Sequence, residues 1–206
     1  MEDIKNKLSN GHGSDANSFY ACLKKHSSHL GSNDKLFIQR VYQGGLQKYI
    51  DRLMAIGFSG RHHVLDAGCG FGQWSLALAS LNDRVDACDV SHLRVDFLSD
   101  MARQLDVTNV VIKISGIDIM PYPDNCFDLV YCYGVIFLTP WRQSLHELSR
   151  VLKPGGKLYV NANGLGWYNY LWKEEHNKTT DYDPKAVAAQ SFSSTLRYNR
   201  EGYYEQ

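Results

Sequence analysis

The stretch that decides the fold reads Val64-Leu65-Asp66-Ala67-Gly68-Cys69-Gly70-Phe71-Gly72. A short apolar run, typical of a buried strand, ends at an acidic residue and leads directly into three glycines separated by single residues. Because glycine has no Cβ, such a turn can bend sharply and bring its backbone against a ligand that larger side chains would exclude. The stretch therefore predicts a strand followed by a turn that binds a nucleotide-like cofactor at the carboxyl end of that strand.

Three details narrow the kind of cofactor. The dinucleotide fingerprint needs a third small residue five positions after the first glycine, and that position is Gln73. The phosphate loop of nucleoside triphosphatases needs Gly-Lys followed by Ser or Thr, and the chain has no such run. Asp66 suits a cofactor with a positive charge better than a pyrophosphate, and Asp89 lies where an acidic residue that binds ribose hydroxyls is expected.

From about residue 61 to residue 163 the sequence resembles the class I methyltransferases that use S-adenosylmethionine. Four segments carry this resemblance in the order and spacing of the family, namely residues 64–72, Asp89, residues 121–130, and Glu147 with residues 150–156. One position departs from it: the family often has an acidic residue and alanine after the third strand, whereas this chain has Gly116-Ile117 with Asp118 one place later. A direct contact between Asp118 and the adenine is therefore not expected.

The resemblance implies S-adenosylmethionine as the cofactor and assigns the residues that would hold it. Asp66 would bind the ammonium of its methionine end, Asp89 both ribose hydroxyls, the backbone of Ile117 the adenine, and Tyr133 with Gly134 would line the floor beside the sulfur. Gly68, Gly70 and Gly72 would let the backbone approach. For Asp66 the alternative is a cap of the following turn, and for Tyr133 it is core packing.

Composition agrees with an ordinary soluble domain. Lysine and arginine total 22, as do aspartate and glutamate, so the net charge does not favour a nucleic-acid partner, although a local basic patch would escape this count. The five cysteines form no Cys-x-x-Cys motif, which favours reduced thiols in a cytoplasmic protein without a metal site. No apolar run approaches the roughly 20 residues of a membrane span.

The apolar pattern predicts a Rossmann-like, doubly wound α/β fold with a mostly parallel sheet in the order 3-2-1-4-5. Strands are expected over residues 62–66, 84–89, 110–114, 127–133 and 157–161. The expected organisation is a mobile or partly helical segment over 1–32, a core with N-terminal lid helices over 33–163, and an acceptor-shaping insertion over 164–206. Gly44-Gly45 divides the lid region, which forms either one bent helix or two helices; a plain cover for the sheet is the alternative to a lid.

The C-terminal part fits the family less well. After Asn161 only 45 residues remain (206 − 161), and residues 195–198 form at best one weak strand, so strands six and seven are weak or missing. A truncated chain is favoured over a short sheet, because natural domains usually protect an edge strand. The segment after residue 163 should then be poorly packed and sensitive to proteases.

The chemistry implied by the resemblance is in-line methyl transfer, in which the protein mainly aligns two reactants and excludes water. No general base is identifiable: Phe137 and Leu138 stand where some relatives have a histidine, and His92 fits a helix start better than a catalyst. Three functions remain: a methyltransferase acting on a small molecule, which is favoured, one acting on tRNA or protein, and a cofactor-binding protein without catalysis.

Overall fold

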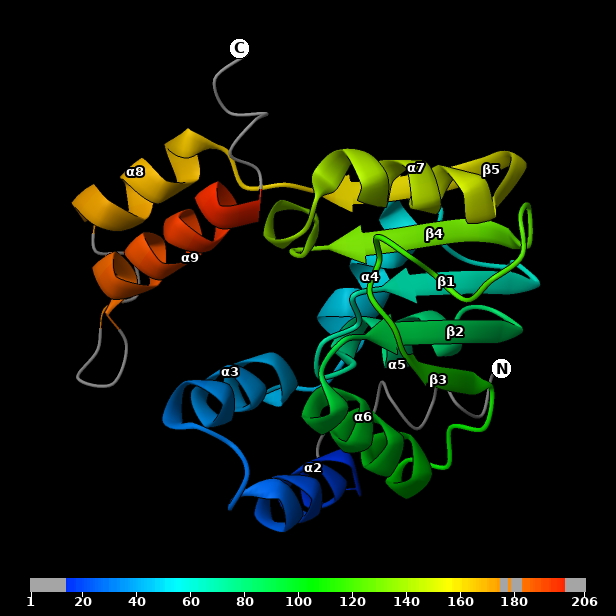
Figure 1. Cartoon of the computed structure of the whole chain (residues 1–206). Coiled ribbons are helices and arrows are strands. Elements are labelled where there is room, and N and C mark those ends of the chain that lie inside the picture. Colours follow the sequence, from blue (N-terminus) through cyan, green and yellow to red (C-terminus); the bar gives the residue numbers. More distant parts are fainter. Residues whose placement is uncertain (1–13, 175–177, 179–182, 199–206) are drawn as a thin grey trace.

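Five parallel strands form one sheet in the order β3-β2-β1-β4-β5 in the computed structural model, which describes residues 14–174, 178 and 183–198 (Figure 1). The strands are β1 (His63–Ala67), β2 (Arg84–Asp89), β3 (Val110–Ile114), β4 (Phe127–Tyr133) and β5 (Leu152–Asn161). The predicted fold class and sheet order are confirmed. All five carboxyl ends therefore meet at one edge of the sheet, which is where ligands bind in folds of this kind.

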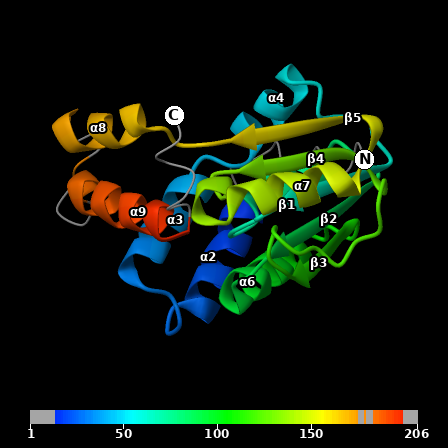
Figure 2. The same cartoon turned by 45° about the horizontal axis from the view of Figure 1, so that its top comes forward.

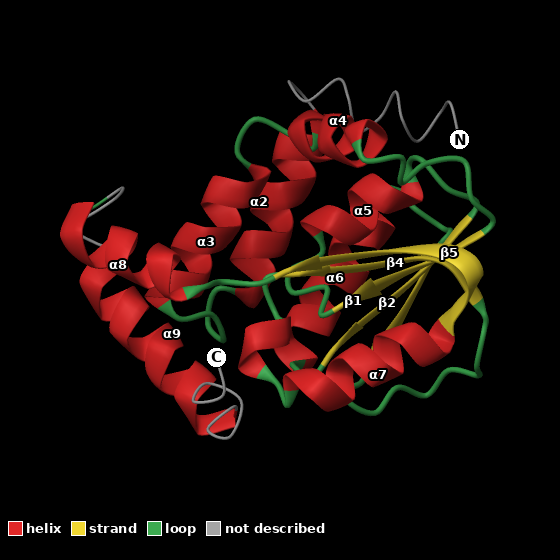
Figure 3. Ribbon diagram, turned by 90° about the horizontal axis from the view of Figure 1, so that it is seen from above, coloured by secondary structure: helices red, strands yellow, loops and turns green. Residues whose placement is uncertain are grey.

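Helices cover both faces of the sheet. One face carries α5 (Gln73–Ala79) and α6 (His92–Gln104), with α2 (Ser14–His26), α3 (Ser32–Tyr42) and α4 (Gln47–Ala55) outside them; α7 (Trp141–Val151) covers the other face. Figure 3 shows α4 and α5 on one side of the strands and α7 on the opposite side. Two separate cores result, because Val64 of β1 packs on the first face while Leu65 and Ala67 pack on the second.

The N-terminal region forms separate helices. Within the segment over residues 1–32, residues 14–26 form α2, and residues 1–13 lie outside the described part of the chain. The lid region forms two helices, because Gly44 and Gly45 both take positive φ angles of 85° and 76° between α3 and α4. A left-handed conformation at two successive residues ends a helix, and glycine adopts it without a steric penalty.

Strand β5 is longer than predicted and irregular at its start. The Lys-Pro-Gly-Gly run over residues 153–156, which precedes the predicted strand, is part of it, with Gly155 at φ 77°, and the register against β4 shifts between Phe127 and Leu129. A short 3-10 turn, η1 (Ile136–Leu138), connects β4 to α7. Thr139 ends this turn and does not cap α7, and Pro140 takes the N-cap position of α7.

The C-terminal region is helical, which corrects the predicted weak strand over residues 195–198. These residues belong to α9 (Pro184–Tyr198), which packs against α8 (Leu165–Glu174) through Tyr168, Leu171, Ala188 and Phe192. Ala188 and Phe192 lie four positions apart, so their contacts follow the helical period and not the alternation of a strand. Figure 2 shows α8 and α9 beyond the carboxyl ends of the strands, and α9 contacts η1. In the described residues the sheet has no sixth strand, and no helix is both long and apolar enough to cross a membrane.

Candidate cofactor site

The carboxyl edge of the sheet brings the predicted site residues together. Strand β1 lies between β2 and β4, and its end is in register with theirs: Ala67 pairs with Cys88, and Asp66 pairs with Tyr131. Asp66, the glycine turn and Asp89 therefore lie on neighbouring strand ends, and Tyr133 ends the strand on the other side of β1. This neighbourhood follows from the sheet order, because residues far apart in sequence meet only when β1, β2 and β4 are adjacent.

The glycine turn is fastened to the end of β2. The N–H groups of Gly68 and Cys69 both donate to the carbonyl of Cys88, each at 2.9 Å, and the N–H of Gly70 donates to Asp89 Oδ2 at 3.0 Å. Three N–H groups that the sequence suggests for a ligand are thus engaged within the protein. The turn is held in one conformation before any ligand arrives, so its shape is pre-organised.

The three glycines of the turn all have positive φ angles, of 55° to 90°, but the space around them differs. A Cβ at Gly72 would overlap the Cδ1 atom of Leu98 in α6, and a Cβ at Gly68 would lie 2.6 Å from Val135 Cγ1. These two positions allow close packing of the chain on itself. At Gly70 and at Gly134, just after β4, a Cβ would meet nothing within 4 Å, so both face open space at the carboxyl edge.

Asp89 is 5% exposed and already has two backbone partners. Its Oδ2 accepts from Gly70, its Oδ1 accepts from the N–H of Ser91 at 2.9 Å, and the guanidinium of Arg94 lies 3.9 Å from Oδ2. Each carboxylate oxygen has two lone pairs, so each retains one for a ligand hydroxyl. The residue is thus fixed in position while keeping the capacity to accept two further hydrogen bonds.

Asp66 is almost completely buried, and its Oδ2 accepts a hydrogen bond of 2.6 Å from the hydroxyl of Ser75 in α5. The pKa of Asp66 is raised to about 7, mainly by burial, which the hydrogen bond from Ser75 opposes and the nearby charge of Asp89 reinforces. The partner Ser75 was missed by sequence reasoning. Its position in the first turn of the helix that follows the glycines is the only signal that could have indicated it.

Tyr133 and Ile117 differ in what they offer to a ligand. The half-buried ring of Tyr133 packs on Trp74 with centroids 5.1 Å apart, and the guanidinium of Arg52 lies 5.3 Å from the Tyr133 centroid. The ring of Tyr133 therefore faces the side of the sheet that α4 and α5 cover. The side chain of Ile117 is 2% exposed and belongs to the core beneath α7, so only its backbone is available for an adenine contact.

Glu147 and Arg150, identified in the sequence as part of a motif, clamp the connection between β3 and β4. Glu147 accepts from the N–H of Met120 at 2.9 Å, and Arg150 donates to the carbonyls of Met120 and Tyr122. Hydrogen bonds from Arg150 are the main reason that the pKa of Glu147 falls to about 2. These two residues shape the segment that contains Ile117.

The other reactive side chains of the described residues lie apart from this edge or are buried. Among the described residues, no group of three His, Cys, Asp or Glu side chains is placed to hold a metal ion. All five cysteines are free, and burial raises the pKa of the Cys88 and Cys132 thiols to about 12, which keeps these two protonated. His146 is exposed on α7.

The donor set fits a cofactor with an ammonium group and a ribose. It provides one buried carboxyl at Asp66, one fixed carboxylate at Asp89, and open space at Gly70 and Gly134 that any Cβ would narrow. A sheet of this order with such an edge defines a Rossmann-like cofactor-binding fold.

Comparison with known proteins shows which family the α/β core resembles. Residues 64–156 match the family model described as "Methyltransferase domain". The 27-O-demethylrifamycin SV methyltransferase of Amycolatopsis mediterranei is 35% identical over 98 residues, which are 46% of this chain and 36% of that protein. The ubiquinone biosynthesis O-methyltransferase of Coxiella burnetii is 30% identical over 126 residues, or 61% of this chain and 52% of that protein. The α/β core of the chain is therefore similar, over residues 64–156, to the domains of methyltransferases.

A solved structure supports the same fold. A protein of Methanococcus maripaludis, provisionally assigned to the S-adenosylmethionine-dependent methyltransferases, superposes with a TM-score of 0.58 at 22% identity, covering 81% of this chain and 82% of that chain. The matched part of the chain spans about a third to a half of the length of these two curated relatives. The predicted family and its cofactor class are confirmed at the level of the α/β core.

Proposed function

We propose that this protein transfers a methyl group from S-adenosylmethionine to a small-molecule acceptor. The observation that carries the proposal is the junction of β1, β2 and β4, where Asp66, Asp89 and the two open glycine positions meet. We assign Asp66 to the ammonium of the cofactor, Asp89 to its ribose hydroxyls, and the backbone of Ile117 to its adenine. Gly70 leaves the space in which the cofactor approaches the backbone, and Gly68 and Gly72 maintain the turn.

When bound, the cofactor supplies an activated methyl group, and the protein's task is to orient both reactants and exclude water. Tyr133 and Gly134 lie at the end of β4, and we assign them to the floor of the reaction site. The ring of Tyr133 is held by Trp74 and Arg52, so it presents a fixed surface. The turn η1, directly after β4, carries Phe137 and Leu138 and no histidine that could act as a base. An acceptor that needs little help from a base therefore suits this site best.

An apolar acceptor is favoured by the helices beyond the carboxyl edge. Four large apolar side chains of α8 are exposed by 41% to 57%, namely Leu165, Trp167, Tyr170 and Trp172. Contacts between α9 and η1 keep this helix pair next to the end of β4. The two curated relatives are named for small-molecule methylation, and the balanced charge of this chain gives no general attraction to a nucleic-acid acceptor.

The test is methyl transfer from S-adenosylmethionine labelled in its methyl group. The full chain is incubated separately with a panel of apolar phenols and hydroquinones, with bulk tRNA and with a protein extract, and labelled products are identified by mass spectrometry. Label should appear in a small molecule and be lost in Asp89→Ala. Label found only in tRNA or protein would refute the small-molecule acceptor, and tight cofactor binding with no transfer to any arm would favour a non-catalytic role.

A further inference from the structure

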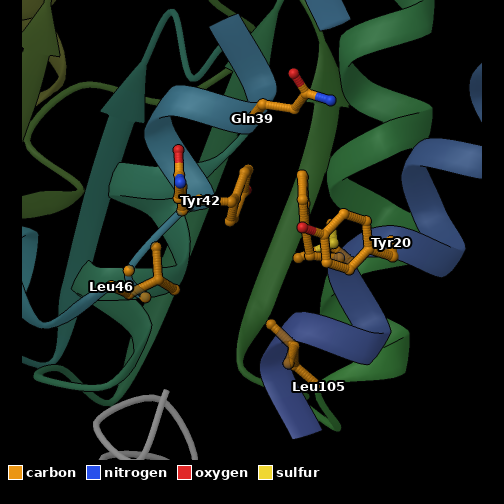
Figure 4. A pocket seen from close by; sticks show the side chains of 10 residues that line it. Tyr20, Gln39, Tyr42, Leu46 and Leu105 are labelled. Atoms are coloured by element: carbon orange, nitrogen blue, oxygen red, sulfur yellow. The ribbon is translucent and has the colours of Figure 1, made fainter. Parts of the chain in front are cut away.

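A cavity of about 280 Å³ lies between the N-terminal helices and the end of α6 (Figure 4). Its wall includes Tyr20 of α2, Tyr42 at the end of α3, Leu46 in the α3–α4 corner, and Leu105 just after α6. Figure 4 shows Tyr20 and Leu105 on one side of this space and Tyr42 with Leu46 on the other. Three separate elements therefore build one concave site, with a volume close to that of small-molecule sites in proteins.

This cavity is distinct from the candidate cofactor site. Helix α6 begins at His92, three residues after Asp89, and the cavity is lined by Met101 and Leu105 at its opposite end. With a rise of about 1.5 Å per residue, Met101 lies about 13 Å along the helix from His92. A ligand in the cavity would therefore not occupy the space beside Asp89.

The lining selects for a particular chemistry. It contains aromatic and aliphatic side chains and two amides, and no charged side chain. The amides of Gln39 and Gln43 form no hydrogen bond with other side chains or backbone groups in the described part of the chain, so both can pair with a ligand. A charged ligand would lose its hydration without gaining an opposite charge, whereas a neutral ring with a hydroxyl or amide would find both partners.

The cavity is connected to the glycine turn through one side chain. The ring of Tyr42 lines the cavity, while its hydroxyl donates a hydrogen bond of 2.7 Å to the carbonyl of Phe71, between Gly70 and Gly72. Burial raises the pKa of Tyr42 well above its usual value, so the hydroxyl remains a donor at physiological pH. A ligand that packs on this ring stabilises the position from which the hydroxyl holds the turn.

We propose that this cavity binds a neutral aromatic small molecule and that its occupancy strengthens cofactor binding through the contact between Tyr42 and Phe71. Binding at two sites that share one structural element is coupled, and the coupling acts equally in both directions. The ligand-binding part of the proposal is independent of the proposed function, and the coupling part rests on it.

The first experiment measures ligand binding to the full chain without cofactor. The probe is 2-naphthol, compared with the anionic 2-naphthoate, and ligand-detected NMR gives both affinities. Gln39→Trp places an indole at the mouth of the cavity from an exposed helix position, and Gln104→Trp makes the same change at an exposed position of α6 outside the lining. We expect 2-naphthol to bind about tenfold more tightly than 2-naphthoate, and only Gln39→Trp to weaken it, by about tenfold or more. No binding, equal binding of the anion, or equal effects of the two variants would overturn the site.

The second experiment measures the affinity for S-adenosylhomocysteine with and without saturating 2-naphthol. Occupancy should raise that affinity by about fivefold, the lower end of typical couplings. Tyr42→Phe keeps the ring and removes the hydroxyl, so 2-naphthol should still bind while the increase disappears. An unchanged affinity in the wild type refutes the coupling. If S-adenosylhomocysteine binds to no form of the protein, the proposed function fails as well, while the first experiment still decides the cavity.

Discussion

The carboxylate of Asp89 accepts a hydrogen bond from the N–H of Gly70, 19 positions earlier in the chain, at 3.0 Å. The acidic residue at the end of β2 and the glycine turn after β1 are therefore one unit. Asp89 fixes the conformation of the turn, and the turn in turn fixes the direction of the carboxylate. Residues proposed to contact a ligand thus also organise the surface that receives it.

Removal of the Asp89 side chain should weaken cofactor binding more than folding. In Asp89→Ala, the affinity for S-adenosylhomocysteine should fall roughly ten- to a hundredfold, because charge-assisted hydrogen bonds contribute on the order of 1.5 to 3 kcal/mol. Calorimetry measures the affinity, and thermal unfolding checks that the variant is folded. Asp83→Ala, which removes an exposed carboxylate just before β2 that contacts His62 and not the turn, is the control. Equal affinities for the wild type and Asp89→Ala would remove Asp89 from the site.

Cofactor affinity should depend on pH through Asp66. Its pKa in the free protein is raised to about 7 by burial, so the carboxyl is largely neutral below that pH. Pairing with an ammonium needs the carboxylate, so the affinity for S-adenosylhomocysteine should rise up to about tenfold per pH unit as pH increases toward 7, and level off above it. Titrations from about pH 5.5 to 8 measure this slope. Asp66→Asn should bind weakly with little slope, and a flat wild-type profile would contradict the assignment.

Gly72 should be intolerant of any side chain. Gly72→Ala adds a Cβ at φ 90°, where it also overlaps Leu98, so unfolding free energy should fall by about 2 to 4 kcal/mol. Chemical denaturation provides the measurement. Gly164→Ala, at a position with nothing within 4 Å and no positive φ, should change stability by less than about 0.5 kcal/mol. Similar stabilities of the two variants would show that the turn does not pack on α6 as described.

The clamp made by Glu147 should be sensitive to acid. Its pKa lies at about 2, below the usual 4.5, so its contribution to stability is complete above pH 4.5 and is lost as pH falls toward 2. Glu147→Gln should reduce unfolding free energy at pH 7 by about 1 to 3 kcal/mol, and by much less near the lower end of that range. Asp96→Asn, an exposed carboxylate of α6, is the control and should show little effect at either pH. A pH-independent difference between Glu147→Gln and wild type would refute the clamp.

Much of the fold could be predicted because its signals are local. Strands β2, β3 and β4 have the predicted bounds, since each is a short apolar run buried on both faces or ended by turn residues. Asp66 and Asp89 could be selected because they end strands that must be neighbours in this topology. The helix α9 was missed because Ala188 and Phe192 form too sparse a stripe to be recognised without their partners in α8.

Contacts between distant side chains left no local signal. The place of Ser75 in the first turn after the glycines does not by itself show its contact with Asp66, and no pattern shows the contact between Tyr42 and the carbonyl of Phe71, because each contact depends on how a helix packs. The three glycines look equivalent in sequence, and only the positions of Leu98 and Val135 distinguish the packing glycines from the open one. The cavity beside Tyr42 likewise exists only once α2, α3 and α6 are assembled.

We expect the carboxyl edge to bind S-adenosylmethionine and its demethylated product, and not a dinucleotide. Calorimetry of the full chain with S-adenosylhomocysteine and, separately, with NAD tests it most directly. We expect saturable binding of S-adenosylhomocysteine with one site per chain and no measurable binding of NAD, because Gln73 replaces the third small residue and Asp66 disfavours a pyrophosphate. Tight binding of NAD together with no binding of S-adenosylhomocysteine would contradict it.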